Sequence, residues 1–411
     1  MASNLGAPSS FQKRAKIKIG QISGTRPSLY NNQLLISTGI PSFDNVIGGG
    51  LAVGTVLLVE EDTYSSYAKI MLKYFIAEGV MTGQSIFLSS AKEPPQQLIK
   101  ELPAPIDDTR VHSKVYPSKS VPPPSTGHPE SQKSITDNAT NDNDKMKIAW
   151  RYQSQPKVKS SPVSNIRFGH YYDLTQTMPV ELIDQVEIVT APSPLDTGPL
   201  NVSPVIPYMN AHYCHLLDQI RKHIDTGCFG TAQNTDKRKI LRICISSIGS
   251  PLWGEMGGVR ANGEGSDPSL PLFFIGLRGI LRSAFAVAMI TVPAHLFHDR
   301  STVKKMERLC DTVVKLDSFA GSEKEKNPVF KEYHGLIHLV QLPRLNSLIP
   351  AQHETSDLAF KLRRKKLTIE KLHLPPELRD PTGGSQEGNT LLSSHGNNSG
   401  CGTSQSSKLS F

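Results

Sequence analysis

Short apolar runs alternate with helical patterns in the first hundred residues. TVLLVE at 55–60 and QSIFLSSA at 84–91 are β-rich runs, and between them KIMLKYFIAEGV at 69–80 repeats its apolar residues at helical spacing. Runs without polar alternation are typical of strands buried on both faces of a parallel sheet. A strand, a helix and a second strand at this spacing predict a βαβ unit.

The same alternation returns after residue 210. Helical patterns occupy 215–224, 272–284 and the region after 300, and strand patterns occupy 239–249, 285–293, 311–319 and 335–344. Parallel strands need crossover connections, which are usually helices, and this alternation supplies them. The pattern predicts an α/β fold with a mostly parallel sheet flanked by helices, whose last strands add antiparallel edges.

Polar stretches rich in Pro, Ser and Gly divide the chain. Residues 1–33 predict a flexible basic arm, and 380–411 predict a disordered low-complexity tail. The domain between them, 34–379, contains a predicted disordered insertion at 103–144 and a loose Pro-rich loop at 191–207. We therefore expect one globular domain of roughly 250 ordered residues with loops and tails attached.

The composition narrows the class of protein without deciding it. The 411 residues carry 45 Lys and Arg against 37 Asp and Glu, a net charge of +8 that favours a polyanionic partner. An ordinary basic soluble protein has the same balance. Five cysteines without a C-x-x-C pair indicate neither a zinc site nor a disulfide framework, and HYCH at 212–215 is interpreted as helix surface.

The sequence also bears on location. It has no apolar core of signal-peptide length at its start, and no continuous apolar stretch of the roughly 18 residues that a membrane span needs. We expect a cytoplasmic protein, with the nucleus as a second location and no membrane contact.

The segment at 37–60, STGIPSFDNVIGGGLAVGTVLLVE, resembles the opening of RecA and KaiC-type ATPases. In those proteins it leads into a phosphate-binding loop, G-x-x-x-x-G-K-[ST], whose N–H groups, Lys and hydroxyl hold phosphates and Mg²⁺. The resemblance implies a RecA-like domain. One interpretation is an active RecA or KaiC-type ATPase acting on DNA or a signalling complex, and another is a likeness of fold alone.

The loop that should bind phosphate lacks the residues for it. EEDTYSSYAKI at 60–70 contains no glycine. Glu60, Glu61 and Asp62 put three carboxylates where the phosphates would lie, and like charges repel strongly in a half-buried site. Lys69 is the one lysine nearby, and an isoleucine follows it instead of Ser or Thr. We predict a degenerate phosphate loop.

The second requirement of such an ATPase is an acidic residue that ends an apolar strand and holds the metal. The strand pattern LRICI runs into Ser246 and Ser247, and a serine does not supply that charge. Both losses agree, so the sequence predicts no catalytic residue, no metal and no bound cofactor.

Several segments together resemble the family of fourth subunits of the Elongator complex. They are GTRPS (24–28), GGGLAVGTVLLVEED (48–62), KYFIAEG (73–79), KMKIAWRYQ (145–153), RFGHYYD (167–173), IGSPLWG (248–254), GSEKEKNPVFKEYHGLIHLVQLPRLN (321–346) and EKLHLPPEL (370–378). The resemblance implies a hexameric ring with the fifth and sixth Elongator subunits, further Elongator subunits as partners, and tRNA binding during carboxymethyl-type modification of wobble uridine. It also implies that the chemistry occurs on another polypeptide.

The same resemblance points to residues that contact RNA. In RecA-like rings two loops line the central channel, and they correspond to 250–269 and 294–305 in this chain. Those loops hold the candidates Arg260, Arg300, Lys304 and Lys305, together with His295, His298 and Trp253. Arg and Lys suit phosphate backbones, whereas the tryptophan either stacks a base or packs under its loop. A protein that only binds other proteins remains an alternative.

The densest positive run is KLRRKKLTIEK at 361–371. Binding to RNA, binding to an acidic protein and a solvated sheet edge are three interpretations of it, and all stay open.

Overall fold

The structure is a computed structural model of the chain, and it describes a set of segments separated by gaps. These are residues 22–28, 33–64, 66–106, 168–192, 209–232, 238–254, 267–343 and 357–373. The chain divides into the units Met1–Leu372 and His373–Phe411, and the fold below is that of the first. Most of the predicted arm, insertion and Pro-rich loop, and all of the predicted tail, lie outside the described residues.

A 9-stranded sheet forms the centre of this unit. Its strands are β4 (Val56–Glu60), β5 (Ser85–Ser90), β8 (Ile188–Thr190), β9 (Leu241–Ser246), β10 (Ala286–Val292), β11 (Thr312–Ser318), β12 (Gly335–Gln341), β13 (Leu358–Arg363) and β14 (Lys366–Lys371). They lie in the order β14-β13-β12-β11-β4-β10-β9-β5-β8. Neighbours are parallel from β8 to β11 and antiparallel from β11 to β14. The predicted mostly parallel sheet with antiparallel last strands is confirmed.

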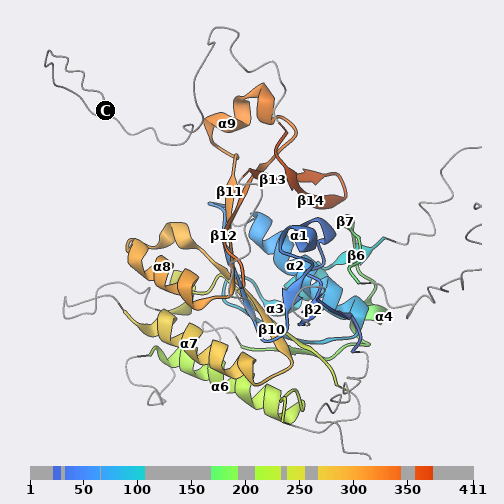
Figure 1. Cartoon of the computed structure of the whole chain (residues 1–411), viewed down its shortest axis with the longest axis vertical. Helices are drawn as coiled ribbons and strands as arrows, with labels where there is room; N and C mark the ends of the chain where they lie inside the picture. Colours follow the sequence, from blue (N-terminus) through green and yellow to red (C-terminus); the bar gives the residue numbers. More distant parts are fainter. Residues whose placement is uncertain are drawn as a thin grey trace, which may run out of the picture. The chain divides into compact units, whose positions relative to one another are not determined.

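Helices cover both faces of the sheet. The longer ones are α2 (Ser66–Thr82) on one face and α6 (Ala211–Thr226), α7 (Ser269–Arg282) and α8 (Arg300–Leu309) on the other (Figure 1). Strand β4 contributes to both cores because successive side chains of a strand point to opposite faces. Leu57 and Val59 pack in the α2 cluster, whereas Val56 and Leu58 pack in the cluster of α6, α7 and α8. Both faces are therefore apolar, as the uninterrupted runs predicted.

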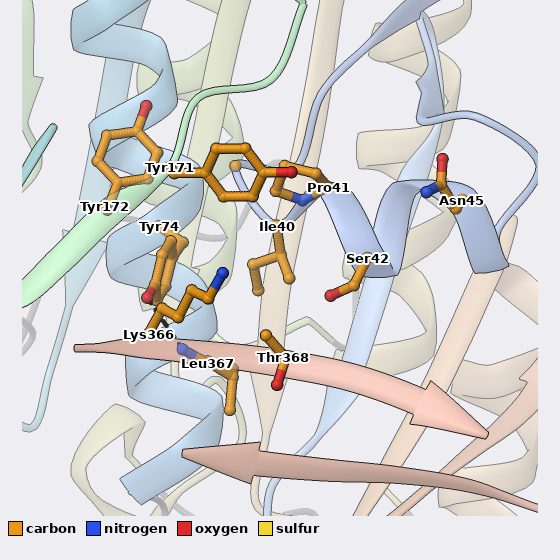
Figure 2. A pocket seen from close by; sticks show the side chains of 11 residues that line it. Ile40, Pro41, Ser42, Asn45, Tyr74, Tyr171, Tyr172, Lys366, Leu367 and Thr368 are labelled. Carbon is orange, nitrogen blue, oxygen red and sulfur yellow. Dashed lines mark hydrogen bonds between the residues drawn. The ribbon is translucent and has the colours of Figure 1, made fainter. Parts of the chain in front are cut away.

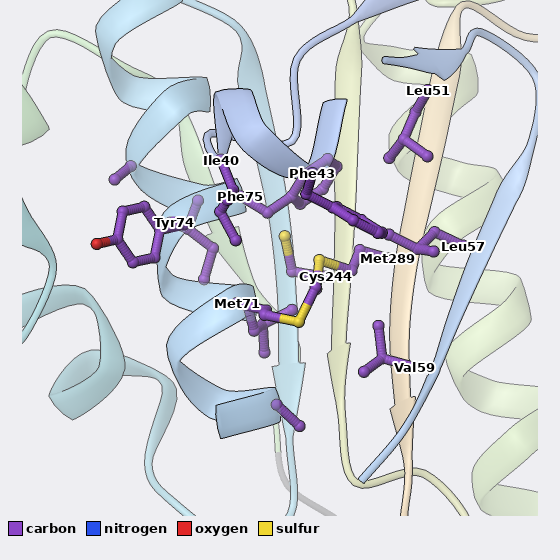
Figure 3. Close-up of a cluster of buried hydrophobic side chains, with 14 of the residues drawn as sticks. Ile40, Phe43, Leu51, Leu57, Val59, Met71, Tyr74, Phe75, Cys244 and Met289 are labelled. Atoms are coloured by element: carbon purple, nitrogen blue, oxygen red, sulfur yellow. The ribbon is translucent and has the colours of Figure 1, made fainter. Parts of the chain in front are cut away.

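The core on the α2 side mixes aromatic, aliphatic and sulfur side chains (Figure 3). Phe43 comes from the short helix α1 (Pro41–Val46), Phe75 from α2 and Cys244 from β9, and all three are fully buried. Arg242 of β9 is buried beside them. Its Nε donates to Gln84 Oε1 at 2.7 Å, and its Nη1 donates to two backbone carbonyls at 2.9 and 3.1 Å. A buried charge needs such partners, so Arg242 cross-links elements that are distant in the sequence.

A buried carboxylate closes the turn before α1. Asp44 accepts hydrogen bonds from the Ser37 hydroxyl and from the Thr38 backbone N–H at 2.8 Å and hydroxyl at 2.6 Å. Gly39 within this turn has a φ of +84°, and a Cβ there would lie 2.3 Å from the Tyr74 carbonyl oxygen. The position therefore requires glycine. Burial raises the pKa of Asp44 to about 6, although these hydrogen bonds oppose the shift.

Two small sheets border the main one. β1 (Thr25–Pro27), β2 (Leu34–Ile36) and β3 (Leu51–Ala52) form one, so part of the predicted flexible arm is a strand. β6 (Pro103–Pro105) and β7 (Tyr172–Thr177) form the other, so the predicted insertion begins in a strand, and β7 contacts β14. Shorter helices are α3 (Pro95–Lys100), α4 (Val180–Ile183) and α9 (Glu323–Lys326). Among the described helices, none has the length and apolar character to cross a membrane.

Candidate functional site

The loop between β4 and α2 follows the segment whose sequence resembles RecA and KaiC-type ATPases, so it is the expected position of a phosphate loop. β4 ends at Glu60 and α2 begins at Ser66. The eight positions of G-x-x-x-x-G-K-[ST], placed directly after the strand, span 61–68, and the Lys and Ser/Thr positions fall on Tyr67 and Ala68. The first turn of the helix therefore offers neither the lysine nor the Ser or Thr hydroxyl at those positions.

Lys69 lies beyond the motif and contacts a different set of carboxylates. Its Nζ is 2.6 Å from Glu93 Oε2 and 3.5 Å from Glu101 Oε2. Partial burial lowers the pKa of Lys69, but the hydrogen bonds and charges of Glu93 and Glu101 outweigh it and raise that pKa. The lysine that the sequence assigns to the degenerate loop is thus held in ion pairs outside it.

Asp62 occupies the N-terminus of α2. Its Oδ1 accepts hydrogen bonds from the backbone N–H groups of Tyr67 at 3.2 Å and Ala68 at 3.5 Å. In a phosphate-binding loop these helical N–H groups and the helix dipole attract the phosphate. In this chain the anion at the helix N-terminus is the protein's own carboxylate, which is buried.

Glu61 joins the end of β4 to the ends of β9 and β10. Its Oε1 accepts hydrogen bonds from Ser247 Oγ and Thr291 Oγ1, both at 2.6 Å. The Ser247 backbone N–H donates to Thr291 Oγ1 at 2.7 Å, which closes the network. Ser247 directly follows β9, where an ATPase would place its metal-holding acid, and its hydroxyl donates to Glu61. Hydrogen bonds to an ionised group are the stronger kind, so this contact stabilises the edge of the sheet.

Glu60 is the third buried carboxyl of the loop. Its Oε1 has no hydrogen-bond partner among the described residues. Burial, followed by a hydrogen bond with Glu307 of α8 and the charge of that residue, raises the pKa of Glu60 to about 7, while Lys315 opposes the shift. Glu60 therefore holds its proton to a higher pH than an ordinary glutamate does. We call residues 60–62 the carboxylate loop. Its side chains contact three different parts of the protein. Asp62 caps α2, Glu61 accepts hydrogen bonds from Ser247 and Thr291, and Glu60 contacts Glu307 of α8.

The predicted RNA-binding residues that the structure describes lie on α8. Arg300, Lys304 and Lys305 are all exposed. Arg300 and Lys304 are one helical turn apart and share a face. Met306 points the opposite way, into the core formed with α6 and α7. The structure therefore gathers three bases on the exposed side of α8, and Arg260 lies outside the described residues.

Trp253 packs inside the protein. It is buried, and its ring centroid lies 6.1 Å from that of Tyr213 of α6. The packing interpretation is confirmed, and stacking on a base is excluded in this conformation. The HYCH segment lies on α6, where His215 Nε2 is 2.9 Å from Gln219 Nε2. The described residues contain no group of three or more His, Cys, Asp or Glu side chains that could hold a metal ion.

The basic run 361–371 forms the hairpin of β13 and β14. Lys361 is buried, and its ammonium pairs with Glu370 across the hairpin. Residues 363–366, with the sequence RRKK, are exposed at the turn and its flanks, and we call them the basic tip. The run is therefore divided between the internal Lys361, the exposed basic tip and the exposed Lys371 at the end of β14.

A pocket of about 220 Å³ lies beside the basic tip (Figure 2). It is lined by α1 and the residues before it, by α2, by the start of β7 and by β14. The lining residues are Gly39, Ile40, Pro41, Ser42, Asn45, Tyr74, Tyr171, Tyr172, Lys366, Leu367 and Thr368. The sequence alone does not reveal this site, because its walls come from four separate segments of the chain. The only signals were the aromatic residues of RFGHYYD and the basic run, which no local pattern connects.

The chain is similar to several known proteins. The PAXNEB protein family matches residues 18–411. Elongator complex protein 4 of Xenopus laevis is 42% identical over 97% of this chain and 94% of its own length. The human protein of the same name is 43% identical over 94% of this chain and 87% of its own length. Among solved structures, a KaiC-like protein from Pyrococcus horikoshii aligns with a TM-score of 0.40 and 14% identity, covering 82% of this chain and 98% of that one.

Proposed function

The chain belongs to the PAXNEB family and is a member of the Elongator complex protein 4 group, and from this premise we propose that it is a non-catalytic RecA-like subunit of the Elongator complex. In this proposal it forms a heterohexameric ring with the fifth and sixth Elongator subunits. The ring binds tRNA while other subunits modify the wobble uridine. The subunit acts in the cytoplasm and also in the nucleus.

The carboxylate loop supports the non-catalytic part of the proposal. Asp62 accepts the N–H groups of the first turn of α2, and Glu61 accepts the hydroxyls that follow β9 and lie on β10. A nucleotide would have to displace both buried carboxylates and bring its own negative charge beside them. At 4 Å, two like charges repel by about 4 kcal/mol at an effective dielectric constant of 20. This one observation favours a structural subunit over an active ATPase.

The exposed bases of α8 support the tRNA-binding part. Arg300, Lys304 and Lys305 are exposed on α8. From the resemblance to RecA-like rings we infer that this segment faces the centre of the ring. Phosphate contacts from Arg and Lys supply most of the sequence-independent affinity for nucleic acid. The net charge of the whole chain, +8, is also positive and therefore attracts the negatively charged tRNA.

The test of assembly is a mass measurement on the native complex. The fifth Elongator subunit carries the tag, and the untagged chain is co-expressed with it and with the sixth subunit. We expect native mass spectrometry of the purified material to give a heterohexamer that contains this chain. Recovery of the fifth and sixth subunits without it would contradict the proposal.

A further inference from the structure

The pocket beside the basic tip has walls that are fixed by hydrogen bonds. The Leu367 backbone N–H donates to Tyr74 Oη at 3.1 Å, and the Ile369 N–H donates to Ser42 Oγ at 3.0 Å. These bonds attach β14 to α2 and to α1, on either side of the cavity. A site that is formed before its ligand arrives loses less conformational entropy on binding. The pocket is thus preorganised.

One wall of the pocket is an exposed aromatic ring. Tyr171 is 46% exposed, and its ring extends over the cavity toward Pro41 (Figure 2). Its backbone is fixed, because its carbonyl accepts a hydrogen bond from Ile106 N at 2.7 Å. A planar ring that is open to solvent and attached to a fixed backbone is the kind of platform on which unpaired bases stack.

Positive charge borders the same wall. Lys366 lines the pocket, and its Nζ lies 5.2 Å from the centroid of the Tyr171 ring. Arg363 and Lys365 of the basic tip pair with carboxylates, whereas Arg364 and Lys366 form no ion pair with the described residues. Among the described residues, no Asp or Glu lines the pocket. An anionic ligand is therefore attracted by Lys366 and meets no carboxylate among these lining residues.

We propose that this pocket holds one unpaired base of a single-stranded RNA segment. The base stacks on Tyr171, and Ser42 and Asn45 at the rim contact its polar edge. The flanking phosphates contact Lys366 and Arg364. The volume of about 220 Å³ is below the roughly 300–1,000 Å³ of pockets for drug-sized ligands, and it suits a single planar ring system.

This RNA contact rests on the RNA binding proposed above, and it is distinct from α8. The basic tip would also attract an acidic protein segment. Such a segment has no planar base to stack on the exposed Tyr171 ring. The combination of the exposed Tyr171 ring with the uncompensated Lys366 is what favours single-stranded RNA.

The test compares single residues of the pocket in the assembled ring of full-length subunits. Fluorescence anisotropy measures binding of a labelled single-stranded oligouridine and of an RNA duplex of equal length, across a range of salt concentrations. The variants are Tyr171→Ala, Tyr171→Phe and Lys366→Gln. Matched controls are Tyr64→Ala, at another exposed tyrosine, and Lys371→Ala, at an exposed lysine at the far end of β14. Native mass spectrometry and thermal unfolding verify assembly and folding of each ring.

We expect Tyr171→Ala to weaken binding of the single strand about ten-fold, because stacking of one base contributes on the order of 1–3 kcal/mol. Tyr171→Phe should stay within about two-fold of wild type. Lys366→Gln should reduce the salt slope by about 0.7, the value for one phosphate of a single strand. The controls and the binding of duplex should change little.

Two results would overturn the inference. The first is a folded, assembled Tyr171→Ala ring that binds the single strand with wild-type affinity. The second is loss of assembly by the pocket variants while the intact rings that remain bind normally, because the pocket would then be a subunit contact. If the wild-type ring binds no RNA at all, the RNA binding proposed for α8 fails as well, so the two failures are distinguishable.

Discussion

Glu61→Ala should destabilise the protein because it removes the acceptor of two buried hydroxyl groups. Ser247 Oγ and Thr291 Oγ1 each donate to Glu61 Oε1 at 2.6 Å. A hydrogen bond to a charged group contributes about 1.5–3 kcal/mol, and part of the loss is offset because a buried charge also disappears. We expect the free energy of unfolding to fall by about 3 kcal/mol. For a domain of this size that lowers the melting temperature by about 6–12 °C.

Chemical denaturation of the wild type and variant measures this change, and a double-mutant cycle identifies its cause. Ser247→Ala should cost less in the Glu61→Ala protein than in the wild type, because the Glu61 acceptor is already absent. Glu101→Ala is the matched control. Glu101 pairs with Lys69 and Lys73 near the surface, and removal of such pairs costs less than about 1 kcal/mol. A Glu61→Ala protein as stable as the control, or Ser247→Ala effects that simply add, would contradict a stabilising role for this network.

Three further predictions concern the carboxylate loop and α8. Millimolar ATP and Mg²⁺ should leave the melting temperature unchanged, whereas a ligand at 100 times its Kd would stabilise the fold by about 2.7 kcal/mol. Glu60→Gln should flatten the stability between pH 4.5 and 7 in denaturant titrations at each pH. The folded pKa of about 7 lies above the ordinary 4.5, so the wild type loses a few kcal/mol as the pH rises through this window. Changing Arg300, Lys304 and Lys305 to alanine should weaken tRNA binding by the assembled ring and flatten its salt dependence by nearly one unit for each phosphate that is no longer neutralised. Weaker binding with an unchanged slope would instead indicate a distorted helix.

Local sequence patterns predicted the helices and strands well, because the hydrophobic pattern of each helix or strand depends on neighbouring residues. The runs at 55–60 and 84–91 became β4 and β5 with α2 between them, and the antiparallel last strands followed from their position after the parallel set. The absence of glycine at 60–70 was also visible. The alignment of the phosphate-loop motif with this segment was not visible in the sequence. When the motif is placed directly after the observed end of β4, its lysine position falls on Tyr67 and not on Lys69.

The rest depended on contacts between distant parts of the chain. Glu61 meets Ser247 and Thr291 only because β4, β9 and β10 end at the same edge of the sheet. Tyr171 and Lys366 come together because β7 contacts β14. Neither pairing leaves a periodic signal in the sequence. The basic run at 361–371 was recognisable in the sequence. Its division into a buried Lys361 and an exposed tip was not, because burial depends on the fold.

The proposed role of this chain, as an Elongator subunit needed for modification of wobble uridine, has a direct readout in tRNA. Mass spectrometry of tRNA nucleosides compares cells that lack the chain with the same cells after the wild-type gene is restored. We expect carboxymethyl-type wobble uridines to be depleted in the first and to recover in the second. Normal levels of these nucleosides in cells without the protein would contradict the proposed role.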